Sequence, residues 1–301
     1  MSTTPRPPNL RLPRDRRLEL ATSPLVMGVL NITPDSFSDG GLWLDPTKAI
    51  DRGLEMLRQG AQLLDLGAES SRPGGGVYGH GAEDLSTEEE LARLLPVLEG
   101  LRGATDAPLC IDTRKGPVAA QALAAGGDLV NDVSLLADPD LGRAVADSGC
   151  PLVLMHSRGA IATMQREIRF DDVVAEVREE LNEGIERAVE LGVERSQIVV
   201  DPGIGFGKTY TQNLQLIRSL NQLAPPAHPV LLGASRKSFI GHFGAAEGQS
   251  VPPPQKRLGG SLAAVGWAAS LGAAMVRVHD VQETVQFLRV WEAIKGTEET
   301  S

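Results

Sequence analysis

Short apolar runs and longer amphipathic runs alternate along this chain from about residue 24 onwards. The apolar runs have the length of buried strands, and the runs between them begin and end with helix signals. This pattern predicts eight strands separated by helices. The predicted strands are 24–32, 63–66, 108–111, 128–130, 152–155, 198–200, 230–232 and 275–278.

Helix starts are marked by capping residues. Asp45-Pro46 and Asp138-Pro139 each place a carboxylate before a proline at the first helical position, and Ser86 with Glu89 forms a capping-box pattern. The predicted helices are 46–60, 86–101, 117–125, 139–149, 171–191, 212–223, 258–271 and 281–294.

Eight strands alternating with helices over residues 21–298 predict one α/β domain, a (β/α)₈ TIM barrel. A doubly wound parallel sheet is the alternative, since periodicity does not say whether the sheet closes. Residues 1–20 carry prolines and arginines without periodicity, which predicts a short N-terminal extension in the form of an extended or mobile arm. The glycine- and proline-rich segment 244–254 is predicted to be an exposed loop.

Composition narrows the classes of partner. The 301 residues include 29 Lys and Arg against 39 Asp and Glu, a formal net charge of −10, which argues against a nucleic-acid partner. No apolar run is long enough to span a bilayer and no signal peptide is recognisable, so no membrane partner is expected. Cys110 and Cys150 lie beside predicted buried strands, which favours reduced thiols in a cytoplasmic protein.

Polar and charged residues follow most of the predicted strands. In a barrel these positions share one mouth, so the side chains are expected to gather there. One set offers carboxylates, an amide and an ammonium, which suit the edge of a flat heterocycle. It consists of Asp112, Asn131, Asp201 and Lys237. A second set offers donors and positive charge, which suit a phosphate or pyrophosphate. It consists of Asn31, Arg72, Arg277 and His279.

The glycine-rich stretch 201–208 directly follows the predicted strand 198–200. Its glycines allow a sharp turn and a close approach to a flat ligand. It fits neither common phosphate loop, because a Walker A motif needs glycine at position 202, which is proline, and a dinucleotide fingerprint needs glycine at position 208, which is lysine.

These motifs, in this order, resemble the dihydropteroate synthase family of pterin-binding enzymes. The match extends over residues 24–290 and is specific as an ordered set. The matching stretches are 27–41, 71–74, Asp112, 131–132, 154–156, 201–208, 235–238 and 277–281.

The resemblance implies a transferase of folate biosynthesis that is a target of sulfonamides. It would condense 6-hydroxymethyl-7,8-dihydropterin pyrophosphate with p-aminobenzoate, giving 7,8-dihydropteroate and pyrophosphate. It also implies Mg²⁺ on the pyrophosphate, with Asn31 as the metal ligand, and a homodimer. The implied catalytic residues are Asp201, Lys237, Asp112 and Asp35.

The resemblance also divides the substrate contacts among three subsites. The implied pterin contacts are Asp112, Asn131, Asp201, Lys237, Met155 and Phe206. The implied p-aminobenzoate contacts are Ser71, Pro73, Phe206, Lys237 and Ser238. The implied pyrophosphate contacts are Asn31, Ser71, Arg72, Arg277 and His279. Position 71 is serine where the family more often has threonine, a departure that bears on the packing of p-aminobenzoate and on sulfonamide affinity.

The chemistry of these residues fits a dissociative substitution. Pyrophosphate would leave first, helped by the metal and the basic set, and Asp201 with Asp112 would stabilise the delocalised pterin cation before the arylamine attacks.

Some residues also have structural interpretations. Asp35 is as well explained as a turn former. His156 is predicted to be a hydrogen-bonded structural histidine, and Lys208 is open to interpretation as a solvated loop charge. Arg236 is open to interpretation as part of an ion-pair scaffold, with Asp280 and Asp132 orienting neighbouring basic side chains.

Two other functions share the predicted pterin site. A pterin-binding methyltransferase, which passes a methyl group from methyltetrahydrofolate to a corrinoid, would not need the Ser71-Arg72-Pro73 loop or the basic cluster at 235–237 and 277–279. A non-catalytic pterin-binding paralogue would be expected to have lost that cluster or Lys237, and both are present.

Overall fold

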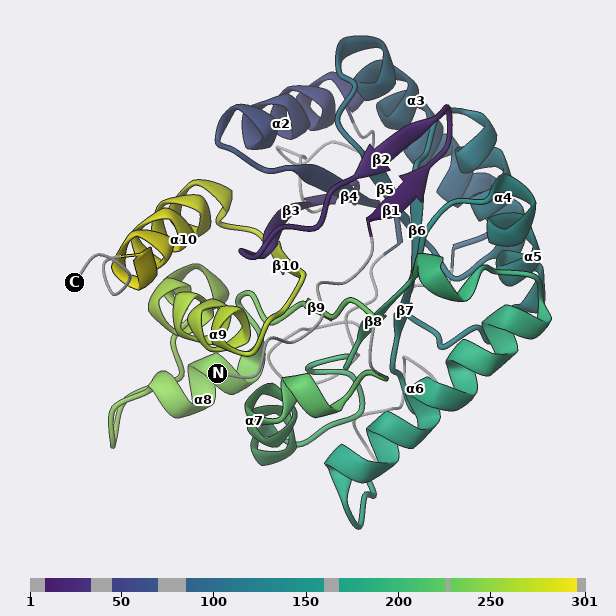
Figure 1. The fold of residues 1–301 in the computed structure, drawn as a ribbon. Coiled ribbons are helices and arrows are strands. Elements are labelled where there is room, and N and C mark those ends of the chain that lie inside the picture. The colour runs from purple at the N-terminus through teal and green to yellow at the C-terminus, as the bar shows by residue number, and fades with distance from the viewer. Residues whose placement is uncertain (1–8, 34–44, 70–84, 160–167, 226–227, 297–301) are drawn as a thin grey trace.

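The computed structural model describes residues 9–33, 45–69, 85–159, 168–225 and 228–296. Within these residues, eight parallel strands form a ring with helices around it (Figure 1). The strands of the ring are β3 (Leu25–Asn31), β4 (Leu63–Gly67), β5 (Leu109–Asp112), β6 (Leu129–Asp132), β7 (Leu152–Met155), β8 (Ile198–Asp201), β9 (Leu231–Leu232) and β10 (Met275–Val278).

The sheet closes into a barrel. Its hydrogen-bonded order runs β8-β7-β6-β5-β4-β3-β10-β9, and a parallel bridge between Val200 and Val230 joins the two ends. The Val200 amide donates to the carbonyl of Pro229 at 3.0 Å across this seam. Closure confirms the predicted TIM barrel and rules out the doubly wound sheet, which keeps two open edges.

The helices start where the capping residues predicted them. Asp45 accepts from the Thr47 amide, Asp138 accepts from the Asp140 amide, and Ser86 completes both bonds of its capping box. The helices are α2 (Pro46–Arg58), α3 (Thr87–Ala104), α4 (Gly116–Ala124), α5 (Pro139–Ser148), α6 (Val173–Glu190), α7 (Tyr210–Arg218), α8 (Ser238–Gly244), α9 (Leu258–Ser270) and α10 (Val281–Gly296), with 3₁₀ turns at Arg195–Gln197, Leu220–Gln222 and Pro254–Lys256.

Two helical details differ from the prediction. The predicted helix 212–223 is divided into α7 and a separate 3₁₀ turn. Helix α8 was not predicted, because seven residues with glycine at both positions 241 and 244 give no clear helical period. The residues after it, 245–253, form a mostly exposed loop as expected.

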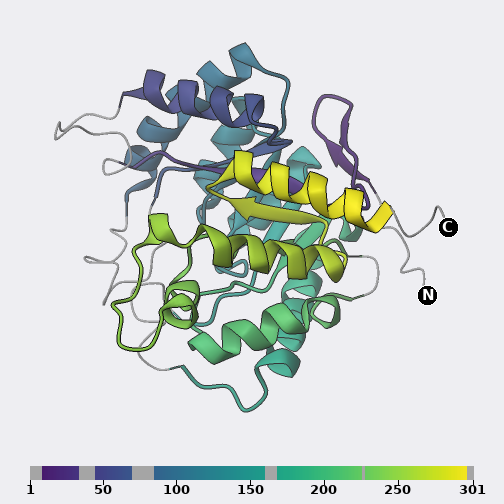
Figure 2. The same cartoon turned by 90° about the vertical axis from the view of Figure 1, so that its left-hand side faces the viewer.

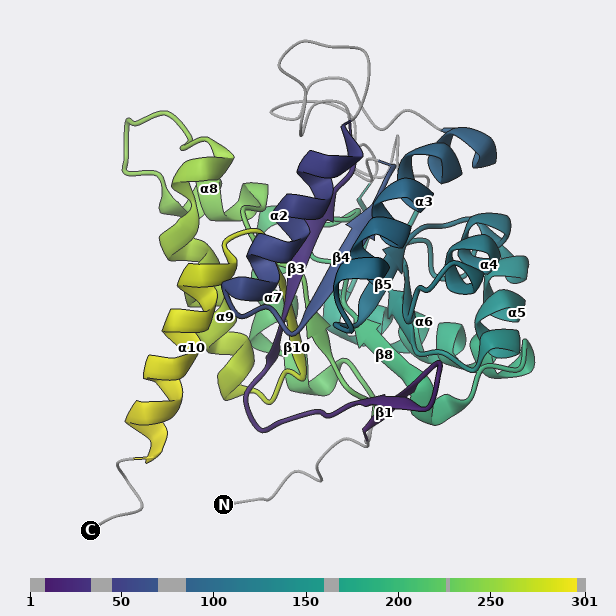
Figure 3. The same cartoon turned by 90° about the horizontal axis from the view of Figure 1, so that it is seen from above.

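The N-terminal residues do not form an extended or mobile arm over their described part. Residues 10–12 (β1, Leu10–Leu12) and 16–18 (β2, Arg16–Leu18) pair as an antiparallel hairpin across the end of the barrel at which the strands begin (Figures 1 and 3). Leucines at every second position point into the barrel floor, and this alternation was the signal that the prediction missed. They are Leu10, Leu12, Leu18 and Leu20.

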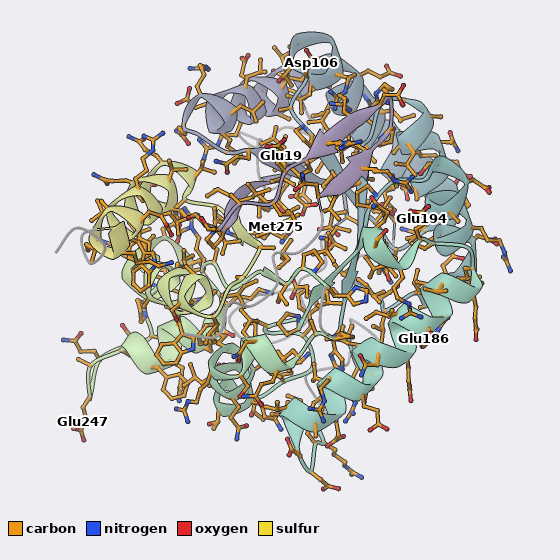
Figure 4. The ribbon with its side chains drawn as sticks, viewed as in Figure 1. Glu19, Asp106, Glu186, Glu194, Glu247 and Met275 are labelled. Atoms are coloured by element: carbon orange, nitrogen blue, oxygen red, sulfur yellow. The ribbon has the colours of Figure 1, made fainter. Side chains whose placement is uncertain are left out.

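Beneath the hairpin, every barrel strand contributes one or two inward residues to a single apolar cluster. Met275 is one of them and lies near the middle of the ring, whereas Asp106, Glu186 and Glu247 lie at the outer edge of the molecule (Figure 4). The other inward residues are Leu25, Met27, Leu63, Cys110, Leu129, Val153, Val199 and Leu231. The barrel is thus packed at its floor, and polar residues become possible only in the layers nearer the mouth.

A buried carboxylate secures the hairpin to the barrel. Asp128, just before β6, is fully buried and accepts from Arg14 and Arg16 of the hairpin. It also accepts from Arg102 of α3 at 2.6 Å and from the Leu109 amide at 3.0 Å. Both carboxylate oxygens are therefore saturated.

Outside the barrel, the helices pack their apolar faces on the outward residues of the strands. Helices α9 and α10 run side by side next to β10 (Figure 2). The described helices include none with the length and apolar character needed to cross a bilayer.

Candidate active site

Strand register places three of the predicted residues, Asn31, Asp112 and Asn131, in one row at the mouth of the barrel. Asn31 pairs with Gly67, Gly67 pairs with Asp112, and Asp112 pairs with Asn131 across four neighbouring strands. Gly67 separates the two polar ends of the row. A Cβ there would lie 3.4 Å from Asp112 Oδ2, an ordinary contact distance.

Arg277 links two carboxylates under this row. Its Nε donates to Asp65 Oδ2 at 2.5 Å, and its Nη2 donates to Asp112 Oδ2 at 2.8 Å. Burial lowers the pKa of Arg277, but Asp65 and Asp112 outweigh burial and raise it above its ordinary value. Burial, reinforced by Asp65, raises the pKa of Asp112 to about 7 although Arg277 opposes the shift.

Asp201 ends β8 on the far side of the mouth, where it pairs in register with Met155. Its Oδ1 accepts from the Gly203 amide at 2.7 Å, in the first turn of the glycine-rich stretch. Burial raises the pKa of Asp201, while this amide and Lys237 act against the shift. The carboxylate is 4% exposed and has only this one hydrogen bond among the described residues.

Lys237 reaches over the glycine-rich stretch from the loop after β9. Its Nζ donates to the carbonyl of Ile204 at 2.6 Å and lies 4.2 Å from the centre of the Phe206 ring. Burial lowers the pKa of Lys237 to about 8, and Asp201 limits the fall. Phe206 also packs with Met155 and Val133, which gives the mouth one apolar wall.

Lys208 closes the glycine-rich stretch from below. Its Nζ donates to the carbonyls of Gly203 and Phe206 at 3.0 and 2.8 Å and contacts His156 Nδ1 at 2.9 Å. The side chain is 2% exposed, so its interpretation as a solvated loop charge is wrong. Burial lowers the pKa of Lys208 to about 7, with Asp201 acting against the shift.

His156 continues from Lys208 towards the surface. Its Nδ1 accepts from Lys208, so Nε2 carries the proton and donates to Glu180 at 2.9 Å. Burial, with the charge of Lys208, lowers the pKa of His156 to about 4. Its predicted role as a hydrogen-bonded structural histidine is confirmed. Arg158 completes the series by pairing with Glu180.

The remaining structural interpretations also have outcomes. Arg236 forms an ion pair with Asp280, as the scaffold interpretation predicts. Asp132 instead accepts from the Ser134 amide at 3.0 Å and from the Leu136 amide at 2.5 Å, so it stabilises a turn. The charge of Arg114 also acts on this carboxylate, opposing the rise that burial causes in its pKa, so its expected role beside a basic side chain stays a prediction.

Other predicted residues fall into two groups. His279 lies at the mouth after β10, where both its amide and its Nδ1 contact Ser235 Oγ, and Ser238 begins α8 directly after Lys237. The predicted positions outside the described residues are Asp35, Ser71, Arg72 and Pro73.

Two residues of the site were not predicted. Asp65 is a carboxylate inside an otherwise apolar strand, and its inward position beneath Arg277 follows only once the strand register is known. Its Oδ1 is buried without a hydrogen-bond partner among the described residues. Lys208 was visible in the sequence, and two of its acceptors lie within five residues of it, but its third partner, His156, belongs to a chain segment that only the fold brings near.

Comparison with known proteins places this mouth in a family. The model of the pterin binding enzyme family matches residues 27–279, most of the chain. The chain belongs to the pterin-binding enzyme family. A dihydropteroate synthase of Synechocystis is 42% identical over 270 residues, covering 89% of each chain.

Solved structures agree in fold over nearly all of the chain. Dihydropteroate synthase from Xanthomonas albilineans in complex with 7,8-dihydropteroate has a TM-score of 0.81 at 41% identity, covering 96% of this chain and 99% of that one. A Yersinia pestis dihydropteroate synthase, in a sulfonamide drug complex, has a TM-score of 0.86 at 39% identity, covering 96% and 100%.

Proposed function

We propose that the chain is a dihydropteroate synthase. It joins the pterin methylene of 6-hydroxymethyl-7,8-dihydropterin pyrophosphate to the amine of p-aminobenzoate and releases pyrophosphate. The observation that carries this proposal is the convergence of Asp112, Asn131, Asp201 and Lys237 at one barrel mouth, beside the apolar wall of Phe206. These groups match the donors and acceptors on the edge of a pterin.

We propose that the pterin is recognised by hydrogen-bonding groups of the site that have few partners within the described protein. Among the described residues the Asp201 carboxylate accepts one hydrogen bond, and Asp201 and Asn131 are both buried. Buried polar groups need partners, so an incoming ligand with ring N–H and carbonyl groups supplies what the protein does not. We assign Asp201 and Asp112 to the ring N–H and amino groups, and Asn131 and Lys237 to the ring acceptors.

Bond cleavage then produces charge that this site tolerates. The bond between the pterin methylene and the pyrophosphate oxygen breaks, leaving a cation delocalised over the ring. Asp201 and Asp112 are already in place at the mouth, where negative charge on a buried carboxylate stabilises a developing cation strongly. The arylamine nitrogen forms the new bond to the methylene and loses one proton.

The leaving group is anionic, and Arg277 and His279 lie on the same strand end. Mg²⁺ on the pyrophosphate is part of the proposal. The half-buried Asn31 at the end of β3 fits it, because Mg²⁺ commonly takes one or two protein oxygens and draws the rest from phosphate and water. The metal would supply positive charge for the departing pyrophosphate.

The p-aminobenzoate subsite is assigned to Phe206, Lys237 and Ser238, with Ser71 and Pro73 from outside the described residues. Support comes from the position of the Phe206 ring under Lys237 Nζ. Sulfonamides, one of which is bound by the Yersinia relative, are proposed to compete at this subsite.

A homodimer is also proposed. The neighbouring helices α7, α8 and α9 each carry an exposed aromatic side chain, Tyr210 at 39% exposure and Phe243 and Trp267 at 50%. Exposed aromatic residues are enriched at protein contacts. Light scattering should give twice the 32.0 kDa chain mass, and Trp267→Glu should lower it. The free thiols Cys110 and Cys150 support a cytoplasmic location.

A pyrophosphate-release assay tests the function. Purified protein is mixed with Mg²⁺ and the pterin pyrophosphate, with and without p-aminobenzoate. Release that depends on p-aminobenzoate and yields 7,8-dihydropteroate is the expected result, and chelation of Mg²⁺ should suppress it. Pterin binding without release would contradict the proposal and favour a non-catalytic paralogue. No observation on the site favours the methyltransferase alternative.

A further inference from the structure

Arg257, at the start of α9, is a buried arginine without an acidic partner among the described residues. It is 2% exposed, and its Nη2 has no hydrogen-bond partner there. Burying a guanidinium without a counter-charge is costly in free energy, so the hydrogen bonds that Arg257 does make have to offset part of that cost. Its Nη1 donates to the carbonyl of Arg236 at 2.9 Å, and its Nε donates to the carbonyl of Pro252 at 2.9 Å.

The residue that Arg257 holds has a strained backbone. Arg236 has a φ of 60°, in the left-handed region that side chains other than glycine seldom adopt. Such a conformation persists only when its surroundings enforce it. The Arg236 amide donates to Ser261 Oγ at 3.0 Å, and Ser261 Oγ in turn donates to the carbonyl of Arg257 at 2.9 Å. The start of α9 therefore forms hydrogen bonds with both the amide and the carbonyl of Arg236.

The side chain of Arg236 is held separately, by Asp280 after β10. Three contacts from two elements thus fix one residue. That residue immediately precedes Lys237, whose Nζ reaches the Ile204 carbonyl and the Phe206 ring. A change at Arg236 from left-handed to right-handed backbone would redirect the chain at Lys237 and withdraw its ammonium from the mouth.

We propose that Arg257 is a positioning residue. It holds Arg236 in the left-handed conformation and thereby aims Lys237 into the substrate site. The role assigned to Lys237 rests on the proposed function. The exposed 245–253 loop also helps to hold Arg257 in place, because the carbonyl of Pro252 near its end accepts a hydrogen bond from the guanidinium. Gly241 of α8 leaves the necessary room, since a Cβ there would lie 2.8 Å from Arg257 Nε.

The first test is kinetic. Arg257→Met should lower kcat/KM about 30-fold, because small misplacements of a substrate-binding group are expected to cost 10- to 100-fold. Lys256→Met, at the exposed neighbouring position, is the matched control and should stay at the wild-type value. Ser261→Ala removes the acceptor of the Arg236 amide and should lower kcat/KM by a smaller factor. This variant replaces Arg257→Met in the test if Arg257→Met does not fold.

Rescue separates positioning from general stability. Glycine adopts the left-handed conformation without strain. Arg236→Gly should therefore restore part of the activity of Arg257→Met, even though it loses the ion pair with Asp280. If Arg257 only stabilised α9, the two changes would add and the double variant would be the less active one. That result, or wild-type kcat/KM in Arg257→Met, would overturn the proposal.

A readout independent of activity separates this inference from the proposed function. A crystal structure of Arg257→Met, or of Ser261→Ala, should show Arg236 outside the left-handed region or Lys237 Nζ away from the Ile204 carbonyl. Both residues unmoved would overturn the inference even in an active enzyme. Wild-type protein without p-aminobenzoate-dependent release would overturn the proposed function alone.

Discussion

At the floor of the barrel, Asp128 accepts from three arginines and a backbone amide, whereas at the mouth Asp201 accepts from one backbone amide. Both carboxylates are buried, at 0% and 4% exposure. The floor supplies more positive charge than one carboxylate needs. Among the residues that the structure describes, the mouth supplies its buried carboxylate with a single hydrogen bond.

This difference separates stability from function. Asp128 joins the hairpin, α3 and β5, so its bonds hold the fold together. Asp201, by contrast, has its pKa raised by burial, so its ionisation works against folding. Polar groups that are incompletely satisfied by the protein are available to a ligand, and active sites commonly carry such a stability cost.

The largest expected effect comes from removing charge at the mouth. Asp201→Asn should lower kcat about 10³-fold, as the loss of a preorganised electrostatic group does in other enzymes. The thermal midpoint should stay the same or rise, because an amide costs less than a carboxylate to bury. Kinetics and calorimetry on the same preparation check both halves. Near-normal kcat would refute the role of Asp201 in stabilising the cation.

The corresponding substitution at the floor of the barrel removes the charge of Asp128. Asp128→Asn should cost about 3 kcal/mol of unfolding free energy, at the lower end for a broken buried ion pair because the three arginines keep some contact with water. Denaturant unfolding measures the loss, and kcat/KM under folding conditions should be unchanged. If activity falls as far as stability, the two ends of the barrel are not independent.

The sequence predicts the mouth better than it predicts the floor. Asp112, Asn131, Asp201 and Lys237 follow apolar strands, and the geometry of a barrel alone requires such strand ends to meet. The hairpin was missed because its strands are three residues long and their leucines are separated by prolines and arginines. Short strands give little periodicity, and their pairing depends on a barrel floor that a local pattern does not reveal.

The pairing of charged residues was the second feature that could not be predicted from the sequence. Asp65 lies 212 positions from Arg277, and Lys208 lies 52 positions from His156. Which charges become partners depends on strand register and loop path, not on local spacing. The roles given to the individual site residues remain predictions, and those given to Asp35 and the 71–73 loop concern residues outside the described part of the chain.

Lys208 is a buried charged group whose hydrogen bonds are all made within the protein, although it lies close to the mouth. It therefore tests whether the number of partners, rather than the position in the barrel, separates stability from function. Lys208→Met leaves the Gly203 and Phe206 carbonyls and His156 Nδ1 without their donor, at a cost of about 2 kcal/mol. The cost should grow with pH. Because burial lowers the pKa of Lys208 to about 7 from 10.5, the unfolded chain binds more protons between these values, and the contribution of Lys208 to stability rises across that window.

Denaturant unfolding of wild type and Lys208→Met at pH 7, 8 and 9 measures this slope. A difference in unfolding free energy that widens as pH rises is the expected result. A constant difference would mean that Lys208 stays fully protonated in the folded protein. Lys256→Met, at an exposed position, is the control and should show no such trend.

The smallest effect concerns the protonation of Lys237. Burial lowers the pKa of Lys237 to about 8, so the ammonium is lost from the free enzyme above that pH, and with it a donor to the pterin. The kcat/KM for the pterin pyrophosphate should therefore fall about tenfold per pH unit above pH 8. Lys237→Arg, whose guanidinium stays charged, should be slower at pH 7 but should lack this basic limb. A basic limb of equal position in both enzymes would assign the titration to another group and leave Lys237 charged throughout.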